Sequence, residues 1–142
     1  MIEKVQESHL YMWLKEKDSK FLSKLDETIE YANTILPQIN NVFASYTVHG
    51  VRHSINVMEY MYALVVDINK LSELEVALLI YSALLHDIGM IANVDEIKEI
   101  KADHAILGER KYSKVLEKYG DEMTALQECV RPVHGKRARD YI

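Results

Sequence analysis

The chain has 142 residues, close to the commonest size of a single domain, and 49% of them are hydrophobic. Its net charge of −5 argues against non-specific nucleic-acid binding, which normally depends on a basic surface. One cysteine excludes an intramolecular disulfide, and no apolar run approaches the roughly 20 residues that span a bilayer, so we expect a cytoplasmic protein without membrane segments.

The first 45 residues are predicted to form a helical extension. Residues 1–18 place apolar side chains at helical spacing, and Ser19 is a plausible N-cap for a second helix. His9 falls in this region, away from the other histidines, and we interpret it as a surface residue. The extension carries little visible chemistry.

Residues 46–142 are predicted to form the functional domain, again from helices alone. After a break at 44–50, a helix is expected over about 51–69, and Ser72 with Glu75 forms a capping box that opens a central helix. Further helices are expected between about residue 95 and Tyr119, and Gly120 is a stop signal. A last helix begins near Asp121, and Pro132 kinks or ends it. The predicted fold class is all-α.

The central helix ends in an unusual way. The apolar run from Val76 to Leu85 is followed at once by His86, Asp87, Ile88 and Gly89. A helix that is apolar nearly all round belongs in the middle of a bundle, where an unpaired carboxylate is costly to bury. Either His86 and Asp87 cap the helix and pair with each other, or the carboxylate is compensated by a cation, a hydrogen-bond network or a metal ion.

The other histidines favour the metal. Five of the six lie between positions 49 and 134, and nearly every one sits at the end of a predicted helix; they are His49, His53, His86, His104 and His134. Helices of a bundle can direct such side chains into one cavity. Imidazole and carboxylate bind Mn, Fe, Ni, Co and Zn, and the absence of clustered cysteines argues against a structural zinc site.

The order His53, His86-Asp87, His104, His134 resembles the HD-domain superfamily of metal-dependent phosphohydrolases. The local contexts agree: HGVRHS opens a helix at residues 49–54, and ALLHDIG closes one at 83–89. The resemblance covers about residues 46–142 and implies an HD-domain-like helical bundle behind the N-terminal helical extension.

By this resemblance, His53, His86 and Asp87 would bind a first divalent ion, and His104 and His134 would add ligands for a second. Mn, Fe, Mg, Ni, Co and Zn are all candidates. His49 is either a further ligand or acid/base group, or a helix cap bonded to backbone.

The implied reaction is hydrolysis of a small phosphoester, with a nucleotide the expected substrate. Asp87 would bridge the ions, and cations near the ligands would contact the phosphate: Arg52, Arg110, Lys136, Arg137 and Arg139. The alternatives are a catalytically inactive HD-like module that binds a nucleotide or a partner domain, and a plain helical interaction domain.

Two features depart from the superfamily pattern. The aspartate that usually completes the site is either Asp140, only six residues after His134, or a residue beyond Ile142, in which case the sequence is a fragment; we favour the fragment. A further C-terminal domain or a homo-oligomer is compatible with this. His134 is followed by Gly135 instead of a second histidine, and a Gly-Tyr-Pro signature is missing, which argues against the cyclic-dinucleotide phosphodiesterases.

Overall fold

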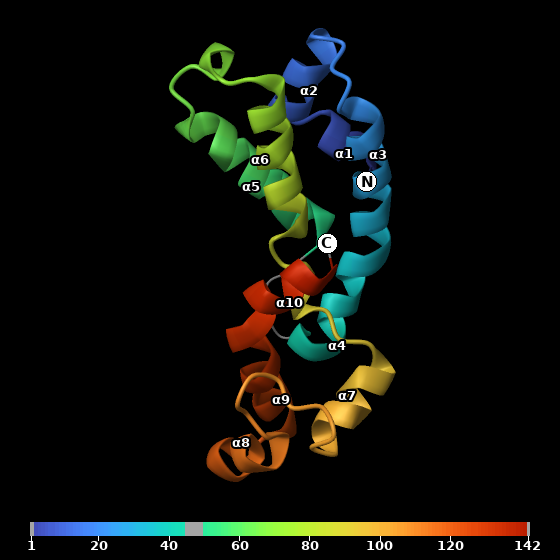
Figure 1. The fold of residues 1–142 in the computed structure, drawn as a ribbon, viewed down its shortest axis with the longest axis vertical. Coiled ribbons are helices and arrows are strands. Elements are labelled where there is room, and N and C mark those ends of the chain that lie inside the picture. The colour runs from blue at the N-terminus through green and yellow to red at the C-terminus, as the bar shows by residue number, and fades with distance from the viewer. Residues whose placement is uncertain (1, 45–49, 142) are drawn as a thin grey trace. The chain divides into compact units, whose positions relative to one another are not determined.

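The structure is a computed structural model that describes residues 2–44 and 50–141. Every regular element in this part of the chain is a helix, as predicted (Figure 1). The α-helices are α1 (Ile2–Gln6), α2 (His9–Glu16), α3 (Leu22–Ile35), α4 (Asn40–Phe43), α5 (Val51–Leu64), α6 (Glu73–Leu85), α7 (Val94–Lys101), α8 (Tyr112–Tyr119), α9 (Glu122–Val130) and α10 (His134–Tyr141). Short 3₁₀ turns are η1 (Leu36–Ile39), η2 (Ile68–Lys70), η3 (Ile88–Met90) and η4 (Arg131–Val133).

Most of the predicted helix boundaries are confirmed by cap geometry. The Ser72 side chain accepts from Glu75 N–H while the Glu75 carboxylate accepts from Ser72 N–H, which is the expected capping box at the start of α6. Gly120 ends α8 in the left-handed conformation, with φ of 70°. At Pro132 the chain makes the η4 turn between α9 and α10, so the proline does interrupt the last helix.

Two boundaries differ from the prediction. The helix predicted to begin at Ser19 is α3, which starts at Leu22 with Phe21 as its N-cap. Ser19 therefore lies outside this helix, and its hydroxyl accepts a hydrogen bond from Phe21 N–H. The helix expected to reach residue 69 ends at Leu64, because Val65 is extended, with ψ of 115°. The Asp67 carboxylate then caps η2 by accepting a hydrogen bond from Asn69 N–H.

The described residues fall into two compact units. The first takes its residues from the ranges 1–37 and 48–86, so the N-terminal helices share a unit with α5 and α6. Both α2 and α3 pack on α6, and α2 also packs on α5. The Tyr11 hydroxyl donates to Asp26 over 2.7 Å, and burial together with this carboxylate raises the pKa of Tyr11 to about 12. The N-terminal helices are therefore part of a packed core.

His9 is at the surface of this unit, as predicted. Its side chain is 63% exposed, its Nδ1 lies 2.6 Å from the Glu59 carboxylate, and its ring stacks on Tyr62. His9 thus has structural partners on α5, Glu59 and Tyr62.

The second unit takes its residues from the ranges 38–47 and 87–142. Within it, α9 packs against α4 and α8, and α10 packs against η3. Buried Gln127 on α9 donates to the Val42 carbonyl, and Asn41 donates to the Ala92 carbonyl, so the short α4 segment is tied to the unit by side-chain hydrogen bonds.

No single helix of the described chain is long and apolar enough to cross a membrane. The one combination that meets the length and composition criteria is the pair Glu73–Met90 and Val94–Lys101, which is bent by 47°.

Candidate metal centre

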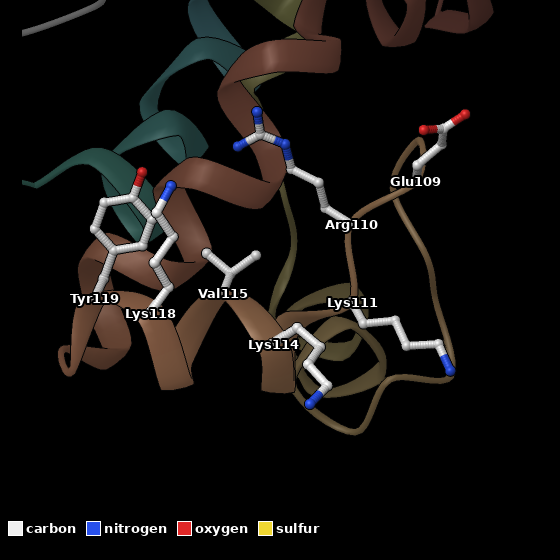
Figure 2. Close-up of a pocket in the computed structure, with 7 residues that line it drawn as sticks. All are labelled: Glu109, Arg110, Lys111, Lys114, Val115, Lys118 and Tyr119. Atoms are coloured by element: carbon white, nitrogen blue, oxygen red, sulfur yellow. The ribbon is translucent and has the colours of Figure 1, made fainter.

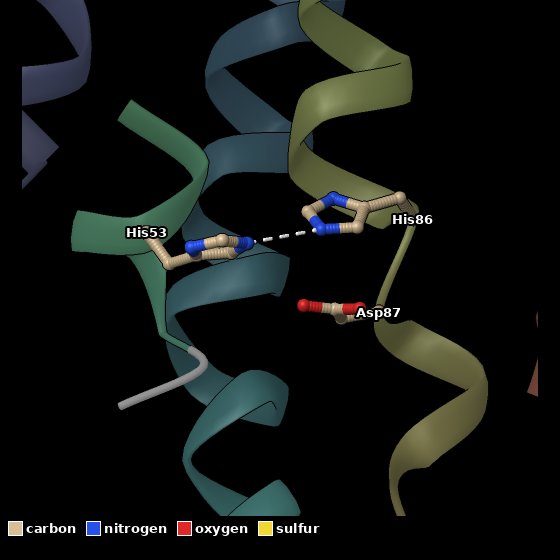
Figure 3. A group of neighbouring side chains, drawn as sticks. All are labelled: His53, His86 and Asp87. Atoms are coloured by element: carbon tan, nitrogen blue, oxygen red, sulfur yellow. Dashed lines mark hydrogen bonds between the residues drawn. The ribbon is translucent and has the colours of Figure 1, made fainter. Parts of the chain in front are cut away.

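The pairing of α5 with α6 brings two of the predicted ligands together. The two helices have 14 and 13 residues, pack against each other, and are joined by the short connection that contains η2 (Figure 1). At 1.5 Å per residue they are about 20 Å long each, so the first turn of α5 lies beside the last turn of α6. His53 stands in that first turn and His86 directly follows α6. Their Nε2 atoms are 3.2 Å apart (Figure 3).

The tautomer of His86 follows from its other nitrogen. The Nδ1–H of His86 donates to the Ala83 carbonyl over 3.0 Å. The other ring nitrogen of His86, Nε2, faces His53 Nε2. A backbone carbonyl that holds Nδ1–H is the usual arrangement behind a metal-binding imidazole, because it fixes both the tautomer and the ring orientation.

Asp87 adds a carboxylate to the imidazole pair. It is the next residue of the chain, is only 9% exposed, and places an oxygen within 4.8 Å of the ligand nitrogens of both histidines (Figure 3). In the described part of the chain, these three residues are the group whose ligand atoms converge closely enough to hold one ion. A carboxylate this little exposed is stabilised by a cation more than by bulk water.

The donor set fits a divalent ion. Two nitrogens bound at 2.0–2.1 Å to one tetrahedral ion lie roughly 3.3 Å apart, and octahedral neighbours lie closer at about 3.0 Å. The observed separation of 3.2 Å falls in this range. Two imidazoles and one carboxylate would leave further coordination positions for water or a substrate, as in catalytic sites. The nitrogen and oxygen donors admit Zn and Mn, Fe, Co or Ni.

The remaining two predicted ligands lie outside this group of three. His134 begins α10 and is half-buried; its Nδ1–H donates to the Arg131 carbonyl over 2.6 Å, which leaves a lone pair on Nε2. His104 follows α7, and its Nδ1 lies 3.3 Å from the Glu99 carboxylate with 70% of the side chain exposed. The role of both imidazoles as ligands of a second ion stays a prediction.

A close backbone approach places α10 against the segment that follows Asp87. A Cβ built on Gly89 would lie 1.8 Å from the His134 carbonyl oxygen and 2.6 Å from the Ala138 nitrogen. Only glycine is compatible with this packing. The glycine of the HDIG sequence therefore allows the first turn of α10, with His134, to sit directly on η3.

Arg137 secures the same contact with hydrogen bonds. Its guanidinium donates to the carbonyls of Gly89 and Ile91 and to the Glu96 carboxylate, and the side chain is only 12% exposed. All three guanidinium nitrogens are engaged. The structure thus gives Arg137 a structural role, and its contact with a substrate phosphate stays a prediction.

The other predicted phosphate-binding residues are at the surface. Arg52 and Lys136 are exposed. Arg139 pairs with Asp140, the late aspartate considered as a final ligand, at 3.2 Å. The Arg110 guanidinium contacts the carbonyl and carboxylate of Glu128. Their role in binding phosphate stays a prediction, and His49 lies outside the described residues.

Sequence reasoning missed the residues that support the ligands. The Ala83 carbonyl behind His86 has no sequence signature, since any residue supplies it. Arg137 was grouped with its basic neighbours, and its partners lie 41 to 48 positions away. The one available signal was Gly89, because a glycine directly after a buried helix end often marks a close approach of another backbone.

Comparison with known proteins gives a family match. The HD-CE family model matches residues 43–142, which contain all of the predicted ligands. No curated protein and no solved structure matches the chain. The match covers most of the sequence. The chain belongs to the HD-CE family and contains an HD-type domain.

Proposed function

We propose that this chain is a metal-dependent phosphohydrolase that acts on a nucleotide or another small phosphoester. The single observation that carries the proposal is the convergence of His53, His86 and Asp87, with 3.2 Å between the two Nε2 atoms. Each of these residues occupies the position that the HD-domain resemblance assigns to the first metal. Membership of the HD-CE family supports the same reaction class.

A divalent ion in this cluster would supply a hydroxide at neutral pH, by lowering the pKa of bound water from 15.7 toward about 7. The chain's own residues would hold that ion in place. The Ala83 carbonyl keeps the His86 Nε2 lone pair aimed at the cluster, and Asp87 contributes negative charge from a position shielded from solvent.

The substrate phosphate would be oriented by cations outside the cluster. Arg52 is exposed next to His53, on the opening turn of α5. A guanidinium binds a phosphate with two parallel hydrogen bonds, so Arg52 is our first candidate for this role. Lys136 and Arg139, in the helix that His134 begins, are the next candidates.

A catalytically inactive nucleotide-binding module is the second candidate. It is favoured by the composition of the cluster, which holds three ligands within the described chain, while Asp140 is paired with Arg139. This module would bind nucleotides without hydrolysing them.

A hydrolysis assay separates the two candidates. The full chain is incubated with bis-p-nitrophenyl phosphate and a nucleotide panel, with Mn²⁺, Zn²⁺ or a chelator. We expect metal-dependent turnover that Asp87→Asn and His86→Gln reduce by at least 100-fold. His9→Gln is the matched control, because this histidine is exposed and lies in the same unit as His53. Nucleotide binding without turnover under every metal condition would contradict the enzyme.

A further inference from the structure

A basic pocket lies on the second unit, formed by α8 and the loop before it. Its volume is about 450 Å³, within the range of small-molecule sites. Figure 2 shows the residues that line it, which are Glu109, Arg110, Lys111, Lys114, Val115, Lys118 and Tyr119. None of these residues belongs to the His53–His86–Asp87 cluster.

The pocket is positive although the chain is acidic overall. Four of its seven lining residues are cations and one is a carboxylate, in a protein with a net charge of −5. Lys114 and Lys118 lie four positions apart on one face of α8, and Lys111 is the N-cap residue directly before this helix. Such a concentration of cations at the start and along one face of a helix creates a local potential that attracts anions.

The cations are only partly neutralised by neighbours. Lys114 pairs with Glu117 at 3.0 Å. The Glu128 carboxylate forms ion pairs with both Arg110, at 3.4 Å, and Arg131, at 2.7 Å, so one negative charge is shared by two guanidinium groups. Lys111 and Lys118 form no ion pair with any residue that the structure describes.

Arg110 is held in place within this group. Its Nη1 donates to the Glu128 carbonyl over 3.0 Å, which fixes the guanidinium at the pocket wall and leaves Nε and Nη2 for a ligand. An arginine fixed in this way loses less side-chain entropy when it binds an anion. The Arg110 contact is therefore compatible with phosphate binding here.

The floor of the pocket is apolar. Val115 is 8% exposed, while Tyr119 is 42% exposed and stacks under the Lys118 ammonium, 4.9 Å from its ring centroid. A ligand that fits this site would combine several negative charges with a part that tolerates an apolar surface. Phosphate chains, free or attached to a nucleoside, have this chemistry.

We propose that this pocket binds a ligand carrying a chain of two or more phosphates, independently of the metal centre. Arg110, Lys111 and Lys118 contact the phosphates, and Tyr119 offers its ring to any attached base. The proposal does not depend on hydrolysis at the metal centre.

Isothermal titration of the full chain at low ionic strength, without added divalent metal, tests the proposal. The probes are inorganic tripolyphosphate and ATP. The test variant is the double substitution Lys111→Ala with Lys118→Ala. The control is Lys24→Ala with Lys98→Ala, which removes the same charge from lysines on α3 and α7. Thermal melts verify that both variants fold.

We expect the test variant to lose at least 10-fold in affinity for tripolyphosphate and the control to lose less than 2-fold. His86→Gln should leave this binding unchanged, which separates the pocket from the metal centre. If Tyr119→Leu weakens only ATP, the ligand is a nucleotide; if it weakens neither probe, the phosphate chain alone is recognised. Equal losses in the two double variants, or no binding of either probe, would overturn the proposal.

Discussion

Helices α6 and α10 each present a predicted ligand histidine at one end, but they are held in place by different forces. α6 ends before His86, and its buried side chains are all apolar: Val76, Ala77, Ile80, Ala83 and Leu84. α10 begins with His134 and buries Ala138. It is secured by the glycine contact at Gly89 and by the hydrogen bonds of Arg137.

The difference predicts how each helix responds to substitution. Hydrophobic burial is non-directional and spread over many atoms, so a residue of similar volume can replace another at small cost. A close backbone approach and a guanidinium with three acceptors each depend on a single residue. We therefore expect His86 to keep its position when core residues of α6 are replaced by residues of similar volume. In contrast, substitution of Gly89 or Arg137 should displace His134.

Leu84→Ala should have the largest effect on stability. Leu84 is fully buried in α6, and truncation of such a side chain costs about 2–5 kcal/mol because a cavity remains. Leu84→Met should cost less than about 1.5 kcal/mol, because it conserves volume. Urea denaturation followed by Trp13 fluorescence measures both, since the only tryptophan lies in the same unit. Equal losses of unfolding free energy in Leu84→Ala and Leu84→Met would contradict the claim that α6 is held by non-directional hydrophobic packing.

Gly89→Ala should destabilise the second unit by about 3 kcal/mol, because the new methyl group overlaps backbone atoms of α10 that cannot rotate away. Gly135→Ala is the control, since a Cβ there meets nothing within 4 Å. Denaturation followed by far-UV circular dichroism measures the effect. A loss no larger than that of the control would show that α10 does not press on η3.

Arg137→Ala should cost about 2 kcal/mol, the usual effect of removing hydrogen bonds to a charged group. Arg137→Lys should restore little, because an ammonium cannot reach two carbonyls and a carboxylate with the same planar geometry. Arg139→Ala is the control, because that side chain is 73% exposed. Full rescue by lysine in the same denaturation experiment would argue for a simple charge effect.

Ser72→Ala should have the smallest effect, about 1 kcal/mol, through loss of the capping box at the other end of α6. The loss should appear in thermal melts without changing metal affinity, because Ser72 lies a whole helix away from His86. Reduced metal affinity in this variant would mean that the position of His86 depends on the start of α6 as well as on its packing.

The sequence predicted what is encoded locally. The all-α fold, the Ser72 cap, the Gly120 stop and the break at Pro132 each depend on residues within a few positions of one another, and all are confirmed. The proximity of His53 and His86 was expected as well, because both lie at ends of predicted helices and both belong to the motifs that resemble HD domains.

What the sequence could not provide depends on distant contacts. Arg137 binds carbonyls more than 40 positions away, and backbone carbonyls leave no trace in side-chain patterns. The packing of α2 and α3 on α6 was missed for a related reason. Their apolar stripes indicate a buried face and do not identify the helix that covers it.

The metal content of the purified chain tests the central claim most directly. After dialysis against Mn²⁺ or Zn²⁺, elemental analysis should find at least one tightly bound ion per wild-type chain. It should find less than a tenth of that in His53→Gln and His86→Gln, and an unchanged amount in His9→Gln. Wild-type protein without bound metal, or His53→Gln and His86→Gln variants that retain a full equivalent, would contradict a metal centre built on His53, His86 and Asp87.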